Sequence, residues 1–185
     1  MQLNNYPNLK FSNYNIRLLE ENDANECVRF YKHNQTYLAP YETITNEHFN
    51  INYWKNKIIK NRTDFEAGLS CYLGVFEEEK LIGMINFSNI IRGVFQSCFL
   101  GYKIDQNYQG LGIMKNAVKT ALKYIFEVLN LHRVSANYLP YNTRSAKLLE
   151  SLGFKQEGIA LKYLYINGKW EDHILTSLIN EEWKL

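Results

Sequence analysis

A short glycine-bearing segment in the second half of the chain has the residue types and spacing of a phosphate-binding turn. Gln109, Gly112 and Met114 form the pattern Q-x-x-G-x-M, between a predicted strand and the start of a long amphipathic helix. Such a turn leaves backbone N–H groups without partners at the positive end of a helix, where they can bind phosphate. The spacings of a nucleotide P-loop and of a dinucleotide-binding fold are both absent. The segment therefore predicts a phosphate site whose ligand depends on the rest of the chain.

A second polar pattern begins about thirty residues after the first, at Asn142. Residues 142–154 read N-x-x-S-x-x-L-L-x-x-L-G-F. Asn142 is a favourable N-cap for a short helix, Ser145 lies in the first turn, and Gly153 supplies a left-handed C-cap. The pattern predicts a helix that carries a hydroxyl close to its N-terminus.

Basic residues are concentrated around these two patterns. Residues 115–155 contain seven lysines and arginines against two glutamates, although the net charge of the whole chain is only +2. A local positive field of this kind suits a small phosphate-bearing ligand better than a nucleic acid, so no direct nucleic-acid binding is expected. A solvated, lysine-rich helix face would give the same charge pattern, and this alternative stays open.

Composition indicates a globular protein with one domain over residues 1–185. Hydrophobic residues make up 46% of the chain, and no apolar run reaches the roughly 20 residues that span a bilayer, so no membrane partner is expected. Cys27, Cys71 and Cys98 form no C-x-x-C pair, which predicts reduced thiols and no metal site. Residues 1–5 lack the basic and apolar regions of an export signal, so a cytoplasmic location is expected.

Hydrophobic periodicity predicts a mixed α/β chain that positions both patterns. The clearest helix follows Met114, where apolar residues recur at three- and four-residue steps to Leu129. Asn167-Gly168 is a strong hairpin turn. Strands are predicted at residues 16–19, 72–76, 81–87, 95–104, 133–138, 160–166 and 173–179, with further helices at 23–34, 47–62 and 143–152 and a loop at 36–46.

Together, the two patterns resemble the GNAT family of acyl-CoA-dependent N-acetyltransferases, over nearly the whole chain. Within that family the resemblance is strongest to the ribosomal-protein-alanine N-acetyltransferases of the Rim type. The segments that carry it are NFSN at 86–89, LGY at 100–102, HRVSANY at 132–138 and GKWEDH at 168–173. The resemblance implies an α/β GNAT fold with a central, mostly antiparallel sheet, a splayed parallel pair of strands and flanking helices.

Acetyl-CoA is the donor that this resemblance implies. The turn would hold its pyrophosphate, the splayed strands its pantetheine arm, and a backbone N–H near Tyr102 its thioester carbonyl. We expect the Tyr102 side chain to pack in the core, and the helical period turns Met114 inward. The residues assigned to the donor are Gly101, Tyr102, Lys103, Ile104, Gln109, Gly110, Leu111, Gly112, Ile113, Met114, Asn137 and Asn142.

Acetyl transfer needs a neutral amine and a proton for the leaving thiolate. Many GNAT enzymes use a tyrosine as the acid, but Leu149 stands at its position, and the resemblance to Rim-type enzymes points to Ser145 instead. An ordinary capping role for Ser145 is the alternative. Glu42, in a Pro-aromatic-Glu loop, is assigned as the base, since Leu164 stands near the place of another proposed glutamate. His132 and His173 are expected to be structural.

The resemblance implies that the acceptor is the α-amine of an N-terminal alanine, on a small-subunit ribosomal protein, attacked directly in a ternary complex. Two alternatives stay open. The same scaffold could acetylate a small amine, such as an antibiotic, a polyamine or an amino acid. The protein could also bind acetyl-CoA without turnover, as a ribosome-assembly factor.

Overall fold

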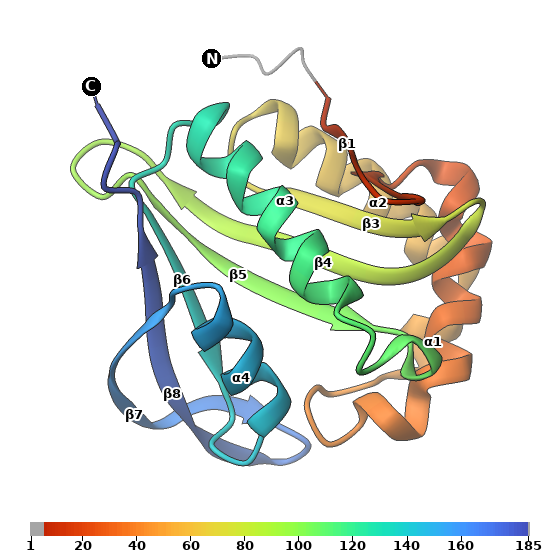
Figure 1. The fold of residues 1–185 in the computed structure, drawn as a ribbon. Helices are drawn as coiled ribbons and strands as arrows, with labels where there is room; N and C mark the ends of the chain where they lie inside the picture. The colour runs from red at the N-terminus through yellow and green to blue at the C-terminus, as the bar shows by residue number, and fades with distance from the viewer. Residues whose placement is uncertain (1–5, 185) are drawn as a thin grey trace.

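A computed structural model describes residues 6–184 of the chain, so the expectation about an export signal in residues 1–5 lies outside the described residues. Two strands, two helices and three strands come first along the chain, and a helix, a strand, a helix and two final strands follow (Figure 1). Their bounds are β1 (Asn8–Phe11), β2 (Tyr14–Leu18), α1 (Ala24–Leu38), α2 (Ile51–Glu66), β3 (Cys71–Glu77), β4 (Lys80–Ile91), β5 (Ser97–Ile104), α3 (Ile113–Glu127), β6 (Arg133–Tyr138), α4 (Thr143–Ser151), β7 (Lys155–Ile166) and β8 (Lys169–Ile179). Short 3₁₀ turns lie at Glu21–Asp23, Asn46–Phe49 and Gln106–Tyr108.

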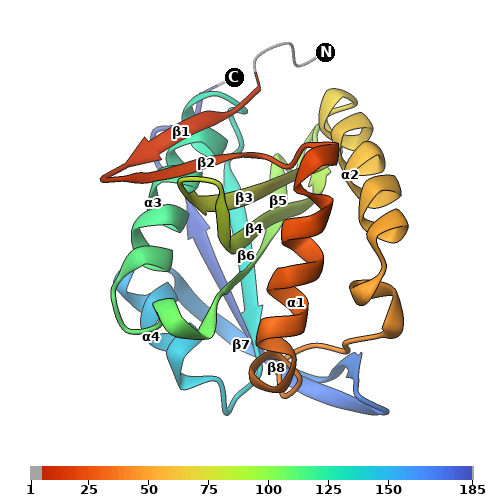
Figure 2. The same ribbon diagram turned by 90° about the vertical axis from the view of Figure 1, so that its right-hand side faces the viewer.

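The strands form one eight-stranded sheet within the described part of the chain, in the order β1-β2-β3-β4-β5-β6-β8-β7. Helices α1 and α2 lie on one side of this sheet, and α3 and α4 lie on the other (Figure 2). The neighbouring strands are antiparallel except for β5 and β6, which are parallel because α3 crosses between them. This topology confirms the predicted GNAT-like arrangement.

The parallel pair separates soon after it begins. Residues 97–99 of β5 pair with residues 133–135 of β6, and no pairing between these two strands continues beyond Phe99. The two strands diverge toward the C-terminal end of β5 in Figure 1. Residues 100–104 therefore leave β6 while their other edge still pairs with β4. This divergence opens the sheet beside the start of α3 and the start of α4.

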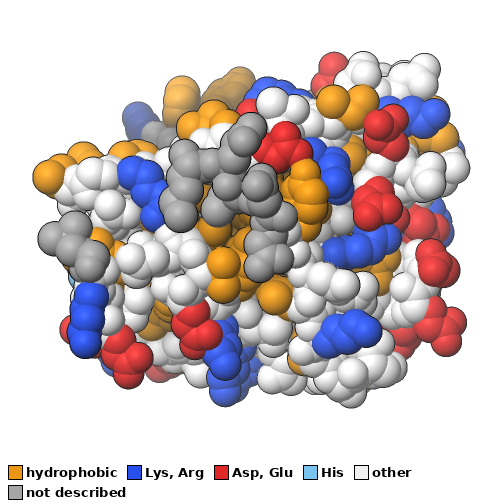
Figure 3. Space-filling model, turned by 90° about the horizontal axis from the view of Figure 1, so that it is seen from above, with side chains coloured by type: hydrophobic (Ala, Val, Ile, Leu, Met, Phe, Trp, Pro, Cys, Tyr) orange, Lys and Arg blue, Asp and Glu red, His pale blue; other side chains and the backbone are white. Residues whose placement is uncertain are grey.

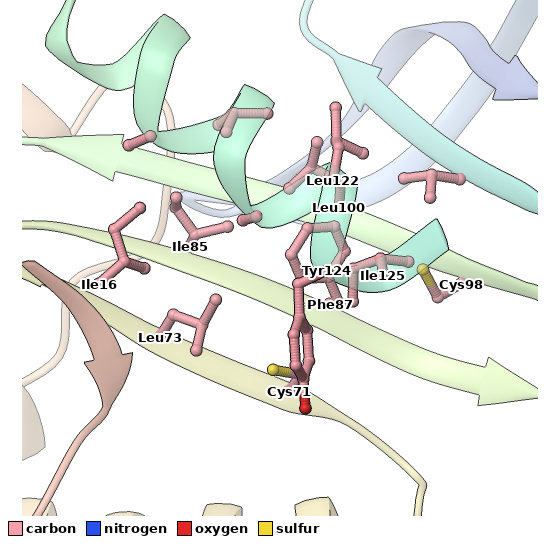
Figure 4. Close-up of a cluster of buried hydrophobic side chains, with 14 of the residues drawn as sticks. Ile16, Cys71, Leu73, Ile85, Phe87, Cys98, Leu100, Leu122, Tyr124 and Ile125 are labelled. Carbon is pink, nitrogen blue, oxygen red and sulfur yellow. The ribbon is translucent and has the colours of Figure 1, made fainter. Parts of the chain in front are cut away.

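Two apolar clusters hold the layers together. The larger one packs α3 on the sheet through residues such as Leu122 and Ile125, which meet Ile85 and Phe87 of β4 (Figure 4). Full burial of such a side chain stabilises the fold by about 1.5–3 kcal/mol. The second cluster packs α1 and α2 on the opposite face of the sheet, around side chains such as Phe30.

Several element bounds differ from the sequence-based expectations. Helix α1 continues to Leu38 instead of ending at Asn34. The buried side-chain amide of Asn34 donates a hydrogen bond to Phe30 O and accepts one from Gln106 N, so this residue is accommodated inside the helix. Strands β4, β7 and β8 are longer than expected, β5 begins two residues later, and β1 was not predicted at all. Asn50 begins α2 by accepting hydrogen bonds from the amides of residues 52 and 53.

The face seen from above carries interspersed acidic and basic side chains, with hydrophobic side chains between them (Figure 3). No large patch of a single charge is visible on this face. Between residues 6 and 184, no helix has both the length and the apolar character that crossing a bilayer requires.

Candidate active site

A groove of about 740 Å³ lies where β5 leaves β6. It runs from the glycine-bearing turn, along the end of β5, to the N-terminal half of α4 and the loop that follows α1. A smaller cavity of about 150 Å³ lies between the diverging strands and shares Gly101, Tyr102, Asn142 and Ser145 with the groove. The groove lining includes the predicted residues Glu42, Gly101, Tyr102, Lys103, Ile104, Gln109, Gly110, Gly112, Ile113, Met114, Asn142 and Ser145.

The turn at the start of α3 has the backbone geometry of an anion site. Gly110 and Gly112 both have positive φ values, of 74° and 71°, and Gly112 is the N-cap of α3. The first helical hydrogen bond runs from Asn116 N to Gly112 O (3.1 Å), so the preceding amides have no helical acceptor. No atom lies within 4 Å of a Cβ built on either glycine. The turn therefore combines amides without helical acceptors with open space beside both glycines, as a phosphate site needs.

Helix α1 fixes this turn from the other side of the sheet. Asp105 is fully buried and accepts a hydrogen bond from Asn107 N (3.0 Å), while Asn34 Oδ1 accepts one from Gln106 N (2.8 Å). His33 and Arg29 of α1 approach the Asp105 carboxylate at 3.4 and 3.8 Å. The strand therefore enters the turn in one defined direction.

Gly101 provides space beside the groove. A Cβ at this position would lie 2.6 Å from Oδ1 of Asn86, which is closer than real Cβ atoms come. Asn86 pairs with Gly101 across β4 and β5 and also lines the groove. The glycine therefore lets a polar amide side chain pack flat against β5.

The Ser145 hydroxyl is turned toward Tyr102. The two side-chain oxygens are 2.7 Å apart, while the Ser145 amide donates to Asn142 Oδ1 (3.1 Å). Asn142 is thus the helix cap, and the Ser145 hydroxyl makes its side-chain contact with Tyr102. The Tyr102 ring packs against the larger core cluster, as expected, but its hydroxyl reaches the groove. Burial raises the pKa of Tyr102 to about 12, so the phenol is protonated at neutral pH.

Glu42 lies in a second polar cluster on the α1 side of β5. Its Oε2 accepts a hydrogen bond from Lys103 Nζ, which also donates to the Tyr31 hydroxyl at 2.7 Å. Burial, followed by the nearby Glu42 charge, raises the pKa of Tyr31 far above its ordinary value. Neither the Lys103 side chain nor Tyr31 was predicted to contact Glu42, because 61 and 11 residues separate them from it in the chain.

The fold and the groove are those expected for the family that the sequence matches. Residues 14–155 match the family described as "Acetyltransferase (GNAT) domain". The chain belongs to the GNAT acetyltransferases. It is 39% identical over 171 residues to the [ribosomal protein uS5]-alanine N-acetyltransferase of Escherichia coli, with 91% of this chain and 88% of that protein covered.

Solved GNAT structures superimpose closely on this acetyltransferase. A ribosomal-protein-S5-alanine acetyltransferase from Vibrio fischeri has a TM-score of 0.93 and 41% identity, covering 97% of this chain and all of that one. RimJ of Mycobacterium smegmatis, solved in complex with CoA-disulfide, has a TM-score of 0.88 and 25% identity, covering 97% and 89%. A CoA molecule is thus present in one close structural neighbour.

Some predicted donor residues of this acetyltransferase lie outside the large groove. Leu111 is 66% exposed at the tip of the turn, and Asn137 lines the smaller cavity, where its amide donates to the Tyr163 hydroxyl (3.2 Å). Met114 is only 5% exposed and packs in the core, which confirms its predicted orientation.

Other reactive side chains are set apart from the groove. Cys98 is buried within the core, where desolvation raises the pKa of its thiol to about 12. A thiol in that environment is a poor nucleophile. His132 packs against the Trp183 ring, with the ring centroids 5.8 Å apart. His173 is buried beside the smaller cavity, and its Nδ1 lies 3.1 Å from Glu171 O.

Proposed function

We propose that this acetyltransferase transfers an acetyl group from acetyl-CoA to the α-amine of an N-terminal alanine on a small-subunit ribosomal protein. The observation that carries the proposal is the continuous groove that joins the anion-binding turn to Ser145 and Glu42. Support for this acceptor comes from the Escherichia coli and Vibrio fischeri relatives, whose names specify an alanine of ribosomal protein S5.

The donor's charge fits the end of the groove where the turn lies. The free amides of the turn would take the pyrophosphate, and Lys115, Arg144 and Lys147 line the same region. The open edge of β5 beyond Phe99 offers backbone groups to the amide-containing pantetheine arm. The thioester would then lie beside Tyr102 and Ser145.

We assign the two polar clusters to the two substrates of a direct acetyl transfer. Glu42 acts on the acceptor amine, and Ser145 with Tyr102 acts on the leaving thiolate. The Glu42 carboxylate takes a proton from the acceptor ammonium and passes it to solvent, and the neutral nitrogen attacks the thioester carbonyl carbon. The same carboxylate then takes the second proton, which this nitrogen loses as the amide forms. A β5 backbone N–H near Tyr102 stabilises the oxyanion. When the C–S bond breaks, the thiolate takes a proton from Ser145 Oγ. The Tyr102 hydroxyl replaces that proton through the 2.7 Å contact and is itself reprotonated from solvent.

The test is an acetylation assay with a synthetic peptide that begins with alanine, read by mass spectrometry and by thiol release. The same peptide with a blocked N-terminus is the control. We expect one acetyl group on the free α-amine and none on the blocked peptide. Acetyl-CoA binding without thiol release, with this peptide and with a panel of small amines, would instead favour a binding protein.

A further inference from the structure

The Glu42 carboxylate is held by only one of its two oxygens. Lys103 Nζ donates to Oε2, and the Tyr31 hydroxyl lies 3.4 Å from the same atom. The other oxygen, Oε1, is buried and meets no hydrogen-bond donor among residues 6–184. A buried carboxylate oxygen without a donor is unfavourable, so the placement of the side chain depends on the contacts that Oε2 makes.

The surroundings of this oxygen limit what can bind there. The Glu42 side chain is 26% exposed and the Lys103 side chain 21%, so both reach the groove without being fully solvated. Tyr31 is only 3% exposed and closes the cluster from behind, with Lys103 Nζ 5.0 Å from the centre of its ring. The cluster therefore fixes one carboxylate oxygen of a glutamate that lines the groove.

We propose that Lys103 is a positioning residue, which together with Tyr31 holds Oε2 of Glu42 and so fixes this carboxylate at the groove for the acceptor amine. The inference rests on the proposed function, because it takes Glu42 as the group that meets the acceptor. Lys103 does not touch the reacting atoms itself. It fixes the rotamer of Glu42 and supplies the opposite charge next to its carboxylate.

The variant that tests this role is Lys103→Met, which keeps most of the side-chain volume and removes the charge. With an alanine-initiated peptide we expect kcat/KM to fall roughly 10- to 100-fold, because a displaced catalytic group can cost that much. The KM for acetyl-CoA should stay unchanged.

Three further variants separate positioning from general damage. Lys103→Arg keeps the cation and should recover most of the activity. Tyr31→Phe removes one hydroxyl and should lower kcat/KM by a smaller factor than Lys103→Met. It provides a test of the proposal if Lys103→Met does not fold. Lys10→Met, on the exposed edge strand β1, should match the wild-type protein in every measurement. Thermal unfolding checks that each variant is folded.

The inference is overturned if folded Lys103→Met retains the wild-type kcat/KM for the alanine-initiated peptide. Failure of the proposed function is a different result, in which the wild-type protein does not acetylate the alanine-initiated peptide. The same variants are then compared on a small amine that the wild-type protein does acetylate. If the wild-type protein acetylates no amine, both proposals are wrong.

Discussion

At the scale of single residues, the pair formed by Tyr102 and Ser145 is the most specific chemical feature of the groove. A serine hydroxyl alone is a weak acid, but here it lies 2.7 Å from a phenol that remains protonated at neutral pH. The pair lies where β5 approaches the first turn of α4, and Leu149 occupies the position of the tyrosine that many GNAT enzymes use. Tyr102 thus offers a phenol from a strand instead of from the helix.

We predict that Ser145→Ala lowers kcat by about 10²-fold, the lower range for loss of a general acid, with little change in the KM for acetyl-CoA. Tyr102→Phe should lower kcat less, because it leaves the serine hydroxyl in place. Tyr72→Phe makes the same change on β3, outside the groove, and should have no effect. Steady-state kinetics with both substrates varied measure these constants, and an unchanged kcat in Ser145→Ala would remove Ser145 from the acid role.

At the scale of elements, the start of α3 depends on a left-handed residue. Gly112 has φ 71° and open space around it. An added Cβ would therefore strain the backbone conformation but would not clash with neighbouring atoms. We predict that Gly112→Ala destabilises the fold by about 1–2 kcal/mol and raises the KM for acetyl-CoA by reorienting the amides of the turn. Calorimetry and kinetics test the two effects separately.

Gly68 supplies the matched control for this prediction. It has a similar φ of 72°, also with open space around it, and it follows α2 outside the groove. Gly68→Ala should therefore lower stability by a similar amount while the KM for acetyl-CoA stays unchanged. If the KM for acetyl-CoA changes equally in both variants, general backbone strain, and not the conformation of the turn, controls donor binding.

The elements also show which parts of the structure the sequence could predict. Helix α3 and the Asn142 cap were predicted correctly, because periodicity and capping are local in the chain. The turn and the serine were found for the same reason. Strand β1 alternates but is only four residues long, and the first half of β7 carries no clear alternation, so their pairing partners decide their structure. Lys103 meets Tyr31 across 72 residues, so only the folded sheet brings this pair together.

At the scale of the whole molecule, the divergence of β5 from β6 places chemistry from distant segments in one groove. Side chains of adjacent strand residues point to opposite faces of a sheet. Tyr102 therefore meets α4 on one side, while Lys103 meets α1 on the other. The contacts that we propose for donor and acceptor thus come from helices that pack on opposite faces of the same sheet.

The charges along the groove lead to a prediction about the acceptor class. Glu42 is the one carboxylate among the described residues that line the groove, and Lys103 already pairs with it. A polyamine carries further ammonium groups, and these would find no acidic partner there while facing Lys103 and Arg144. We therefore predict that spermidine is acetylated at least roughly tenfold less efficiently than an alanine-initiated peptide, as one unfavourable charge contact of about 1.4 kcal/mol would give.

Alaninamide is the informative control for this comparison, because it presents the same α-amine without a second cation and without a peptide chain. We expect its kcat/KM to lie between the values for the peptide and for spermidine, with most of its deficit in KM. Competition assays at a fixed acetyl-CoA concentration, read by mass spectrometry, rank the three acceptors directly. If spermidine is acetylated as efficiently as the peptide or more efficiently, Glu42 and Lys103 do not select acceptors by their charge. A small-molecule amine then becomes the better candidate substrate.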